Sequence, residues 1–345
     1  MLELFKPYTE ELVKIVILLA LVSLAIAYLT WLERKVIGHI QSRLGPMRVG
    51  WHGLLQPIAD GIKFIIKEDI IPAKADRFGF ILAPLLAFIP AFIVFALIPF
   101  DGPQAFTVGG RTYSGYVADV DIALLFVMAI TSICVLGLIV GGWASNSKYP
   151  LLGALRSVAQ LVSYEIPMGL SVMGVVLMAG SLSLVQIVQA QERLGWWFFL
   201  PQLVGFVIYF ICGVAETNRN PFDLPEAEAE LVGGYHTEYS GFRFALFFLA
   251  EYANMITISA VAATLFLGGW LMPFPSLLAP YLSWVPGIVW FSLKVFVFLF
   301  LYLWFRGTFP RYRFDQLMGI MWKILLPVAI ANILVTAGVM LYLNR

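Results

Sequence analysis

Eight apolar stretches, each long enough to cross a lipid bilayer, dominate the sequence. A hydrocarbon core of about 30 Å takes roughly 20 apolar residues in a helix, and only helices satisfy their own backbone polar groups over such runs. The sequence therefore predicts an all-α integral membrane protein, a single polytopic domain over residues 1–345 with eight transmembrane helices. The predicted spans cover residues 15–32, 78–100, 122–144, 158–185, 195–215, 244–271, 285–305 and 324–343.

Composition excludes the soluble classes. Hydrophobic residues make up 61% of the chain and charged residues 12%, against roughly 45–50% and 25% in soluble domains. The net charge of +1 gives no reason to expect a nucleic-acid partner. The two cysteines, Cys134 and Cys212, form no CxxC pair, and the three histidines have no metal-binding spacing. The chain is therefore expected to hold no metal or redox cofactor of its own.

Positive charge is distributed unevenly between the loops. Lysines and arginines gather in loops one, three, five and seven, whereas the alternate loops contain only Arg111 and Arg193. The positive-inside rule then places the four basic loops in the cytoplasm and both termini outside, on the periplasmic side. These loops are residues 33–77, 145–157, 216–243 and 306–323.

The first basic loop contains an amphipathic segment at about residues 53–67. Its apolar residues recur at helical spacing, and Asp60, Lys63 and Lys67 fall on the other side. The segment is too short and too charged to span a bilayer, so it is predicted to be a helix in the interface plane. Two interpretations stay open here: a membrane anchor, or a wall for an amphipathic ligand that enters from the bilayer.

Loop five, residues 216–243, is acidic and is predicted to be cytoplasmic. Six carboxylates crowd into 23 residues, opposed only by Arg219 and Arg243. Repulsion between like charges favours protonation of some of them, which suits proton exchange. A solvated acidic loop, with a helix starting after Pro225, explains the same charges without a function. The six are Glu216, Asp223, Glu226, Glu228, Glu230 and Glu238.

Only three ionisable residues fall within the predicted spans: Glu165, Glu251 and Lys294. A charge at the centre of a bilayer costs roughly 3 kcal/mol or more, so it needs a partner or a function. The three are predicted to be hydrated proton-relay positions; the alternative is a structural salt bridge between Lys294 and one of the two glutamates.

Charges also cluster at the cytoplasmic end of the first span, where Glu33, Arg34 and Lys35 follow one another. Such residues are usually anchors whose charged ends reach the interface. They are equally suited to line an entrance beside Asp60. No nucleotide-binding or hydrolase motif occurs in the chain.

Two long segments carry a family resemblance. Residues 31–69, which begin WLERKVIGHIQSRLGPMRVG, and residues 216–255, which begin ETNRNPFDLPEAEAELVGGY, resemble a membrane subunit of respiratory complex I. This subunit is called H in the bacterial NADH:quinone oxidoreductase and subunit 1 in mitochondria. RYRFDQLM near the end and SYE in the fourth span fit the same family.

The resemblance implies eight transmembrane helices, an interfacial helix and a location in the bacterial inner membrane. It implies that the chain joins peripheral-arm subunits to form a quinone chamber and contacts small membrane subunits. Quinone is then the substrate, while FMN and iron–sulfur clusters belong to partner subunits.

It also implies residue roles. The chamber is expected to include Glu33, Arg34, Lys35, Asp60, Lys63 and Phe222. The coupling loop is expected to include Glu216, Arg219, Asp223, Glu226, Glu228 and Glu230, and the start of the proton relay Glu165, Glu216 and Glu251. Lys294 is added to this relay because of its charge within the seventh span. Two alternatives compete: the homologous anchor subunit of a membrane-bound hydrogenase-type complex, and a free-standing secondary ion transporter. The second is disfavoured because no internal repeat is visible.

Overall fold

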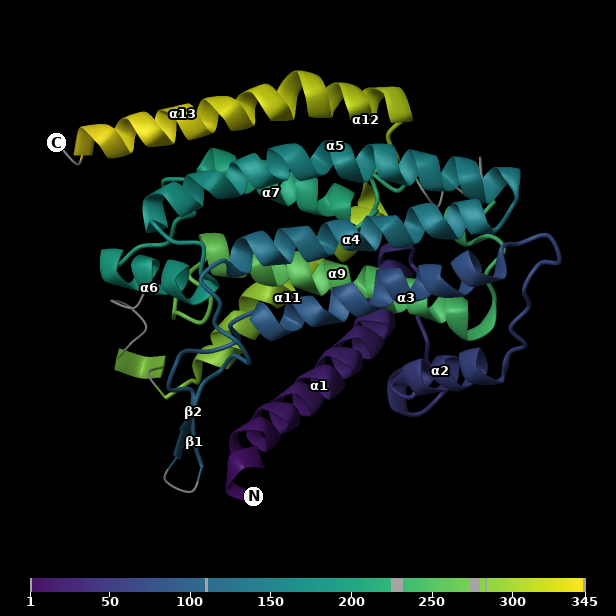
Figure 1. Cartoon of the computed structure of the whole chain (residues 1–345), viewed down its shortest axis with the longest axis horizontal. Coiled ribbons are helices and arrows are strands. Elements are labelled where there is room, and N and C mark those ends of the chain that lie inside the picture. Colours follow the sequence, from purple (N-terminus) through teal and green to yellow (C-terminus); the bar gives the residue numbers. More distant parts are fainter. Residues whose placement is uncertain (1, 109–110, 225–231, 274–279, 283, 344–345) are drawn as a thin grey trace.

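The computed structural model of the chain describes residues 2–108, 111–224, 232–273, 280–282 and 284–343. Most of the long helices run side by side (Figure 1). They are α1 (Leu2–Ile40), α3 (Arg77–Ile93), α4 (Ala123–Ala144), α5 (Lys148–Ala179), α7 (Leu203–Glu216), α9 (Gly241–Phe266), α11 (Gly287–Thr308), and α12 (Phe314–Ile320), which continues through a π-helical turn (Met321–Leu325) into α13 (Leu326–Leu343).

Shorter elements connect these helices. Three single 3₁₀ turns lie at Trp51–Gly53, Val94–Leu97 and Gly234–His236. The others are α2 (Gln56–Ile66), α6 (Leu184–Leu194) and an antiparallel hairpin of β1 (Phe106–Val108) and β2 (Arg111–Tyr113). Neither the hairpin nor α6 as a separate helix was expected from the sequence.

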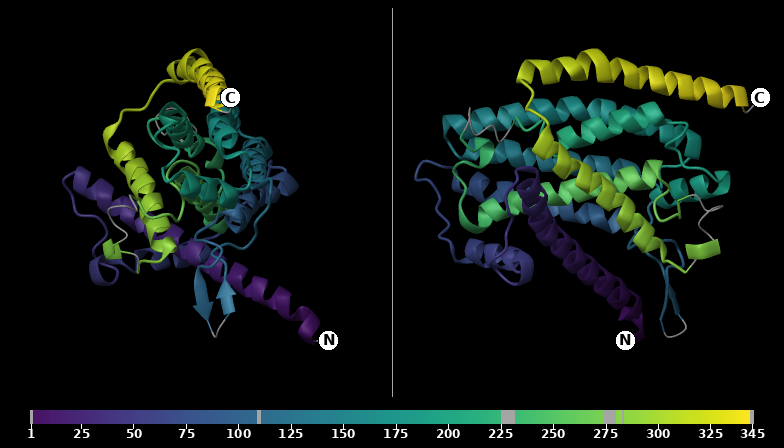
Figure 2. Two further views of the ribbon diagram at one scale, coloured as in Figure 1. Left: turned by 90° about the vertical axis from the view of Figure 1, so that its left-hand side faces the viewer. Right: turned by 180° about the vertical axis from the view of Figure 1, so that it is seen from behind.

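Helix α9 forms the centre of the bundle. Of the most apolar stretch of α9, 72% is buried inside the protein. The buried share of the corresponding stretch is 17% in α1 and 17% in the helix formed by α12 and α13. Helices α3, α7 and α11 all pack against it. The α12–α13 helix forms an outer layer, and α1 crosses the bundle obliquely, with its N-terminal end reaching beyond the other helices (Figures 1 and 2).

Small residues let α3 and α4 approach closely. A Cβ at Gly137 of α4 would lie 2.8 Å from the amide nitrogen of Ala87 and 2.9 Å from the carbonyl oxygen of Ala83. Only glycine fits at that distance, as is typical where helices pack within membranes.

The described residues contain seven helices that are long and apolar enough to cross a membrane. The predicted fifth span, 195–215, corresponds to α7, which has 14 residues and a length of about 21 Å. Gly195 ends α6 in the left-handed conformation, and the chain then turns until residue 202, so its apolar residues there are not helical. An eighth span through α7 stays a prediction, as does the side of the membrane on which the loops lie.

The predicted fourth span, 158–185, differs from α5 at both ends. The helix starts ten residues earlier, because the charged Lys148 and Arg156 are tolerated in its first turns, and it ends where Gly180 adopts a left-handed conformation. Pro84, Pro90 and Pro167 lie within continuous helices, whereas Pro201 lies in the turns before α7.

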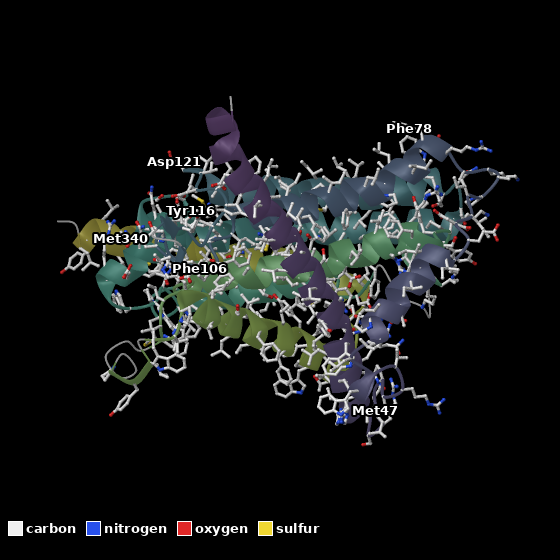
Figure 3. The ribbon with its side chains drawn as sticks, turned by 90° about the horizontal axis from the view of Figure 1, so that it is seen from below. Met47, Phe78, Phe106, Tyr116, Asp121 and Met340 are labelled. Carbon is white, nitrogen blue, oxygen red and sulfur yellow. The ribbon has the colours of Figure 1, made fainter. Side chains whose placement is uncertain are left out.

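The helices end in two groups of loops. We call the end where α3 and α9 begin and α7 ends the charged end; the β-hairpin and α6 lie at the opposite end (Figure 1). Seen from below, Phe78 and Met47 lie toward the charged end, and Phe106, Asp121 and Met340 toward the other (Figure 3).

Candidate functional site

A buried cluster of charged side chains joins four elements at the charged end. Arg219 donates to both carboxylate oxygens of Glu33 on α1 at 3.3 Å, and its second terminal nitrogen lies 3.0 Å from Glu251 on α9. The hydroxyl of Tyr252 donates to Glu33 at 2.6 Å, and Arg306 of α11 also pairs with Glu33. We call these five residues the Arg219 cluster.

The chain folds so that Arg219 reaches this position directly after α7. The helix ends at Glu216, and Asn218 takes a positive φ of 49°, which asparagine tolerates better than most residues. The Arg219 amide then bonds back to the carbonyl of Val214 at 3.2 Å. The sharp turn directs the guanidinium between α1 and α9.

Arg219 is only 3% exposed, yet it remains a cation. Burial by itself would lower the pKa of its guanidinium, but the carboxylates of Glu251 and Glu33 outweigh this and raise the pKa well above its ordinary value. The guanidinium also stacks over the ring of Tyr252, 4.5 Å from its centroid. The planar guanidinium of Arg219 is therefore held between the carboxylates of Glu33 and Glu251.

A cavity of about 490 Å³ opens beside the cluster. Its wall combines apolar and charged groups, which suits an amphipathic ligand with a polar head. It is lined by Thr30, Glu33, Arg34, Ile37, Arg43, Gly45, Pro46, Phe248, Tyr252 and Arg306.

Helix α2 attaches to α1 next to this cavity. Asp60 accepts from Arg34 at 2.6 Å and from Gln56 at 3.2 Å, and Lys63 lies 3.8 Å from it. Two isoleucines of α2 point outward, Ile62 with 52% and Ile65 with 72% exposure, whereas Phe64 packs against Phe244 of α9. The amphipathic helix is thus present within the predicted range. Its placement in the interface plane stays a prediction.

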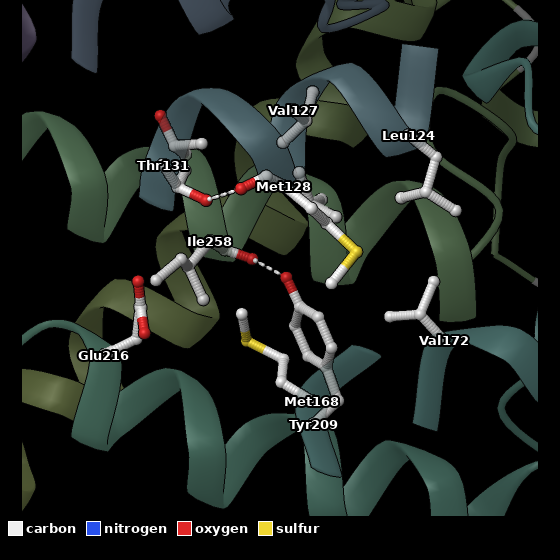
Figure 4. Close-up of a pocket in the computed structure, with 11 residues that line it drawn as sticks. Leu124, Val127, Met128, Thr131, Met168, Val172, Tyr209, Glu216 and Ile258 are labelled. Carbon is white, nitrogen blue, oxygen red and sulfur yellow. Dashed lines mark hydrogen bonds between the residues drawn. The ribbon is translucent and has the colours of Figure 1, made fainter. Parts of the chain in front are cut away.

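Glu216 lies on the inner side of the cluster, buried between two small cavities. One, of about 40 Å³, is lined by Glu216, Glu251 and Asn254; the other, of about 20 Å³, by Glu216, Thr131 and Tyr209 (Figure 4). Each has room for about one water molecule. Within the described part of the chain, one oxygen of Glu216 and the side-chain oxygens of Asn254 and Thr257 are buried without a hydrogen-bond partner.

Glu165 lies on the neighbouring helix, near the middle of α5. It accepts a hydrogen bond of 2.9 Å from Ser132 of α4. Ser132 follows Thr131, which lines both small cavities.

Lys294 does not join these carboxylates. Its ammonium donates to the carbonyls of Leu267, Gly269 and Leu271 at 2.6–2.8 Å, just beyond the C-terminus of α9, and lies 4.6 Å from the ring centroid of Trp197. The salt bridge to a glutamate considered from the sequence is wrong, because the carbonyls that follow a helix C-terminus supply the negative potential. Its role as a relay stays a prediction.

Phe222 packs in the core instead of lining the large cavity. Its ring lies 5.6 Å from Tyr164 and 5.8 Å from Tyr312. The next residue, Asp223, pairs with Arg311 at 2.9 Å.

Lys35 lies beside Met47, and its ammonium is 2.8 Å from the sulfur. The predicted Glu226, Glu228 and Glu230 lie outside the described residues.

His236 belongs to the 3₁₀ turn that covers the start of α9. Burial lowers the pKa of its imidazole to about 4, an effect that Asp223 partly opposes. The ring packs against Tyr235 and Phe244. His236 is therefore neutral at pH 7.

Two members of the cluster were missed from the sequence, Tyr252 and Arg306. Tyr252 follows Glu251 directly, and Arg306 is the first charge after the seventh predicted span. The contact between Arg306 and Glu33 could not be predicted, because the sequence does not show which helices are neighbours. Among the described residues, no group of histidine, cysteine or acidic side chains is arranged to hold a metal.

The chain is similar over most of its length to known proteins. The profile of the NADH dehydrogenase family matches residues 13–337. The chain is 51% identical to the NADH-quinone oxidoreductase H subunit numbered 2 of Geobacter metallireducens, over 95% of each chain. It is 53% identical to the protein of that name from Rhizobium meliloti, over 94% of this chain and 96% of the relative. It is 54% identical to the NADH-quinone oxidoreductase H subunit of Rhodospirillum rubrum, over 91% and 89%.

Proposed function

The chain belongs to the NADH dehydrogenase family, and from this premise we propose that it is the membrane subunit that forms the quinone chamber of a proton-pumping NADH:quinone oxidoreductase. It is then a multi-pass subunit of a bacterial membrane, as the names and sources of the relatives and the apolar helices support. The names of these relatives favour this function over a hydrogenase-type anchor or a free-standing transporter.

One observation carries the proposal: the Arg219 cluster links the large cavity to the small cavity of about 40 Å³. Glu33 lines the large cavity, and Glu251 lines a small one that also contacts Glu216. Arg219 contacts both Glu33 and Glu251. A change of charge in the large cavity therefore has a short electrostatic route to Glu216.

The chemistry of a quinone fits the large cavity. Reduction to a quinol takes up two electrons and two protons at the head group. In this proposal the electrons come from FMN and iron–sulfur clusters of partner subunits, and this chain binds the head group and responds to its charge. Arg34 and Arg306 are donors on the wall, and Phe248 and Ile37 supply apolar contact.

Coupling to protons then begins at Glu33. A head group that changes charge alters the potential at Glu33 and, through the fixed guanidinium of Arg219, at Glu251. Glu216 exchanges a proton with a water in the small cavities on either side. The route continues toward Glu165 on α5, which carries the effect into the rest of the membrane arm.

The remaining predicted residues have places in this proposal. Asp60 and Lys63 hold α2 at the entrance, where its exposed isoleucines face lipid. For Glu226, Glu228 and Glu230 the proposal keeps the coupling role that the family resemblance implies. Phe222 supports the loop from the core, and Lys294 stabilises the end of α9.

The test is proton pumping by the purified complex with Glu216→Gln in liposomes. We expect quinone reduction to continue with a reduced number of protons pumped per electron, because the amide cannot exchange a proton. Asp121→Asn, which alters an exposed acid toward the opposite end, is the matched control and keeps the full ratio. Electron transfer from NADH to an artificial acceptor reports equal assembly. An unchanged ratio in Glu216→Gln would refute the coupling route.

A further inference from the structure

Ser132 of α4 lies beside Glu165 of α5, where the two helices pack together. Its hydroxyl oxygen is 2.9 Å from one carboxylate oxygen of Glu165 and 3.0 Å from the carbonyl oxygen of Met128, one turn earlier in α4. A serine hydroxyl has a single hydrogen, so it donates to one of these two acceptors at a time. It also has lone pairs, so it can accept a hydrogen bond while it donates another.

The carbonyl of Met128 does not depend on Ser132 for a side-chain donor. Within α4 it accepts from the backbone amide four residues later, and the hydroxyl of Thr131 donates to it at 2.9 Å. A carbonyl oxygen has two lone pairs, and these two donors occupy them. The hydroxyl of Ser132 can therefore turn toward Glu165 without leaving Met128 unsatisfied.

The surroundings of Ser132 and Glu165 are apolar. Both residues are half-buried, and Glu165 lies near the middle of α5. The residues that follow them, Ile133 and Ile166, are 39% and 43% exposed on the outer side of the bundle. Across a bilayer such a side meets lipid or another subunit and not water. Both the ionised and the protonated form of Glu165 therefore need a hydrogen-bond partner within the protein.

Few charged groups lie on the helices that pack most extensively against α5. Helices α4 and α13 have none, and α7 has only Glu216. Within the described part of the chain, the hydrogen bond that Glu165 accepts comes from Ser132. The smaller contacts of α5 are with elements that carry Arg243, Glu251, His236, Glu192, Arg193 and Lys323, and none of these has a hydrogen bond or ion pair to Glu165 in the described residues.

We propose that Ser132 is a positioning residue that serves both protonation states of Glu165. When Glu165 is ionised, the hydroxyl of Ser132 donates to the carboxylate. When the carboxylate takes up a proton from the relay, its new O–H donates to the oxygen of Ser132, whose hydrogen turns to the carbonyl of Met128. The carboxyl group thus gains and loses a proton without movement of either helix. This inference rests on the relay role of Glu165 in the proposed function.

The test is infrared difference spectroscopy of the intact complex between acidic and alkaline pH, which reports the C=O stretch of protonated carboxyl groups. Glu165→Gln identifies the band of Glu165, because the band disappears in that variant. We expect Ser132→Ala to shift this band to a higher frequency, since the O–H of Glu165 loses its acceptor. The ratio of protonated to ionised Glu165 at a given pH should rise about tenfold, because a hydrogen bond to a charged group is stronger than one between neutral groups.

Two further variants separate the hydroxyl from the packing of α4. Ser132→Thr keeps a hydroxyl at the same position and should restore the native band. Ser157→Ala is the matched control, because within the described residues this buried hydroxyl donates only to the carbonyl of Gly153, at 2.9 Å, and it should leave the band unchanged. A band that Ser132→Ala leaves unchanged would overturn the proposal. So would the absence of a Glu165 band at every pH at which the complex is intact.

Proton pumping distinguishes this proposal from the proposed function. If Glu165→Gln keeps the full number of protons per electron while Ser132→Ala still shifts the band, the coupling route through Glu165 is wrong and the role of Ser132 stands. If Glu165→Gln lowers the number of protons per electron and Ser132→Ala leaves the band unchanged, the route stands and the role of Ser132 is wrong.

Discussion

Replacing Arg219 by glutamine removes the charge that bridges Glu33 and Glu251. Glu33 keeps its contacts with Tyr252 and Arg306, but the 3.0 Å ion pair between Arg219 and Glu251 is lost. Both carboxylates are largely buried, with side-chain exposures of 6% and 12%. The variant therefore leaves buried negative charge with less compensation than in the native protein.

The magnitude follows from that burial. Removing one partner of a buried ion pair costs about 3–5 kcal/mol. The loss of this ion pair destabilises the turn after α7. In this turn the backbone amides of Thr217, Asn218 and Arg219 donate to carbonyls in the last turn of the helix. Opening of this turn exposes the cluster to water, so its opening equilibrium should increase by about two to nearly four orders of magnitude.

Hydrogen exchange of residues 214–222 in the intact complex, followed by mass spectrometry, measures this opening. Arg311→Gln is the matched control, because its ion pair with Asp223 has side-chain exposures of 36% and 16% and should contribute less than about 1 kcal/mol. Adding Glu251→Gln to Arg219→Gln should restore part of the protection. If Arg219→Gln speeds hydrogen exchange of residues 214–222 by less than tenfold, the Arg219 cluster is not the main constraint on this turn.

Three other predictions follow from the same contacts. Lys294→Met should speed exchange at residues 263–271 by at least about tenfold, because three carbonyls lose their donor; a smaller change would contradict this structural role, and a fall in proton stoichiometry would support the predicted relay. Asp60→Asn should weaken protection of α2 by less than about fivefold, since its pair with Arg34 is half exposed; a larger loss would contradict the surface assignment. For His236, the folded pKa of about 4 lies below the ordinary 6.5, so the unfolded segment binds the proton first and stability falls as the pH falls through that range. Between pH 7 and pH 5 the segment 232–240 should lose about 2 kcal/mol of local stability, measured by exchange corrected for intrinsic rates, and His236→Gln should not show this loss.

Much of the fold was predictable because membrane helices leave a strong signal in the sequence. Long apolar runs located seven helices, and helical spacing located α2 within its predicted range. The errors occurred where apolar residues continue beyond a helix. Residues 195–202 are apolar but form turns, since Gly195 ends α6 in a left-handed conformation. Composition does not show that backbone change.

The site was predictable only in part. Glu251 was identified as a candidate because a charge within the membrane needs a partner or a function. Glu33 was identified because it belongs to the charged end of the first span and because the family resemblance implies a place in the chamber. Their shared partner Arg219 could not be assigned, because the contact joins α1, α9 and the turn after α7, which are far apart in the sequence. Lys294 shows a second limit: backbone carbonyls satisfy its charge, and no pattern of side chains reveals them.

The most direct test of the central claim is photo-crosslinking with an azido-quinone on native membranes that contain the complete complex. The account predicts label in residues 30–46 and 248–252, which line the large cavity, and loss of that label when unmodified quinone is added. Label confined to other subunits, with none on this chain, would contradict the assignment of the cavity as a quinone site.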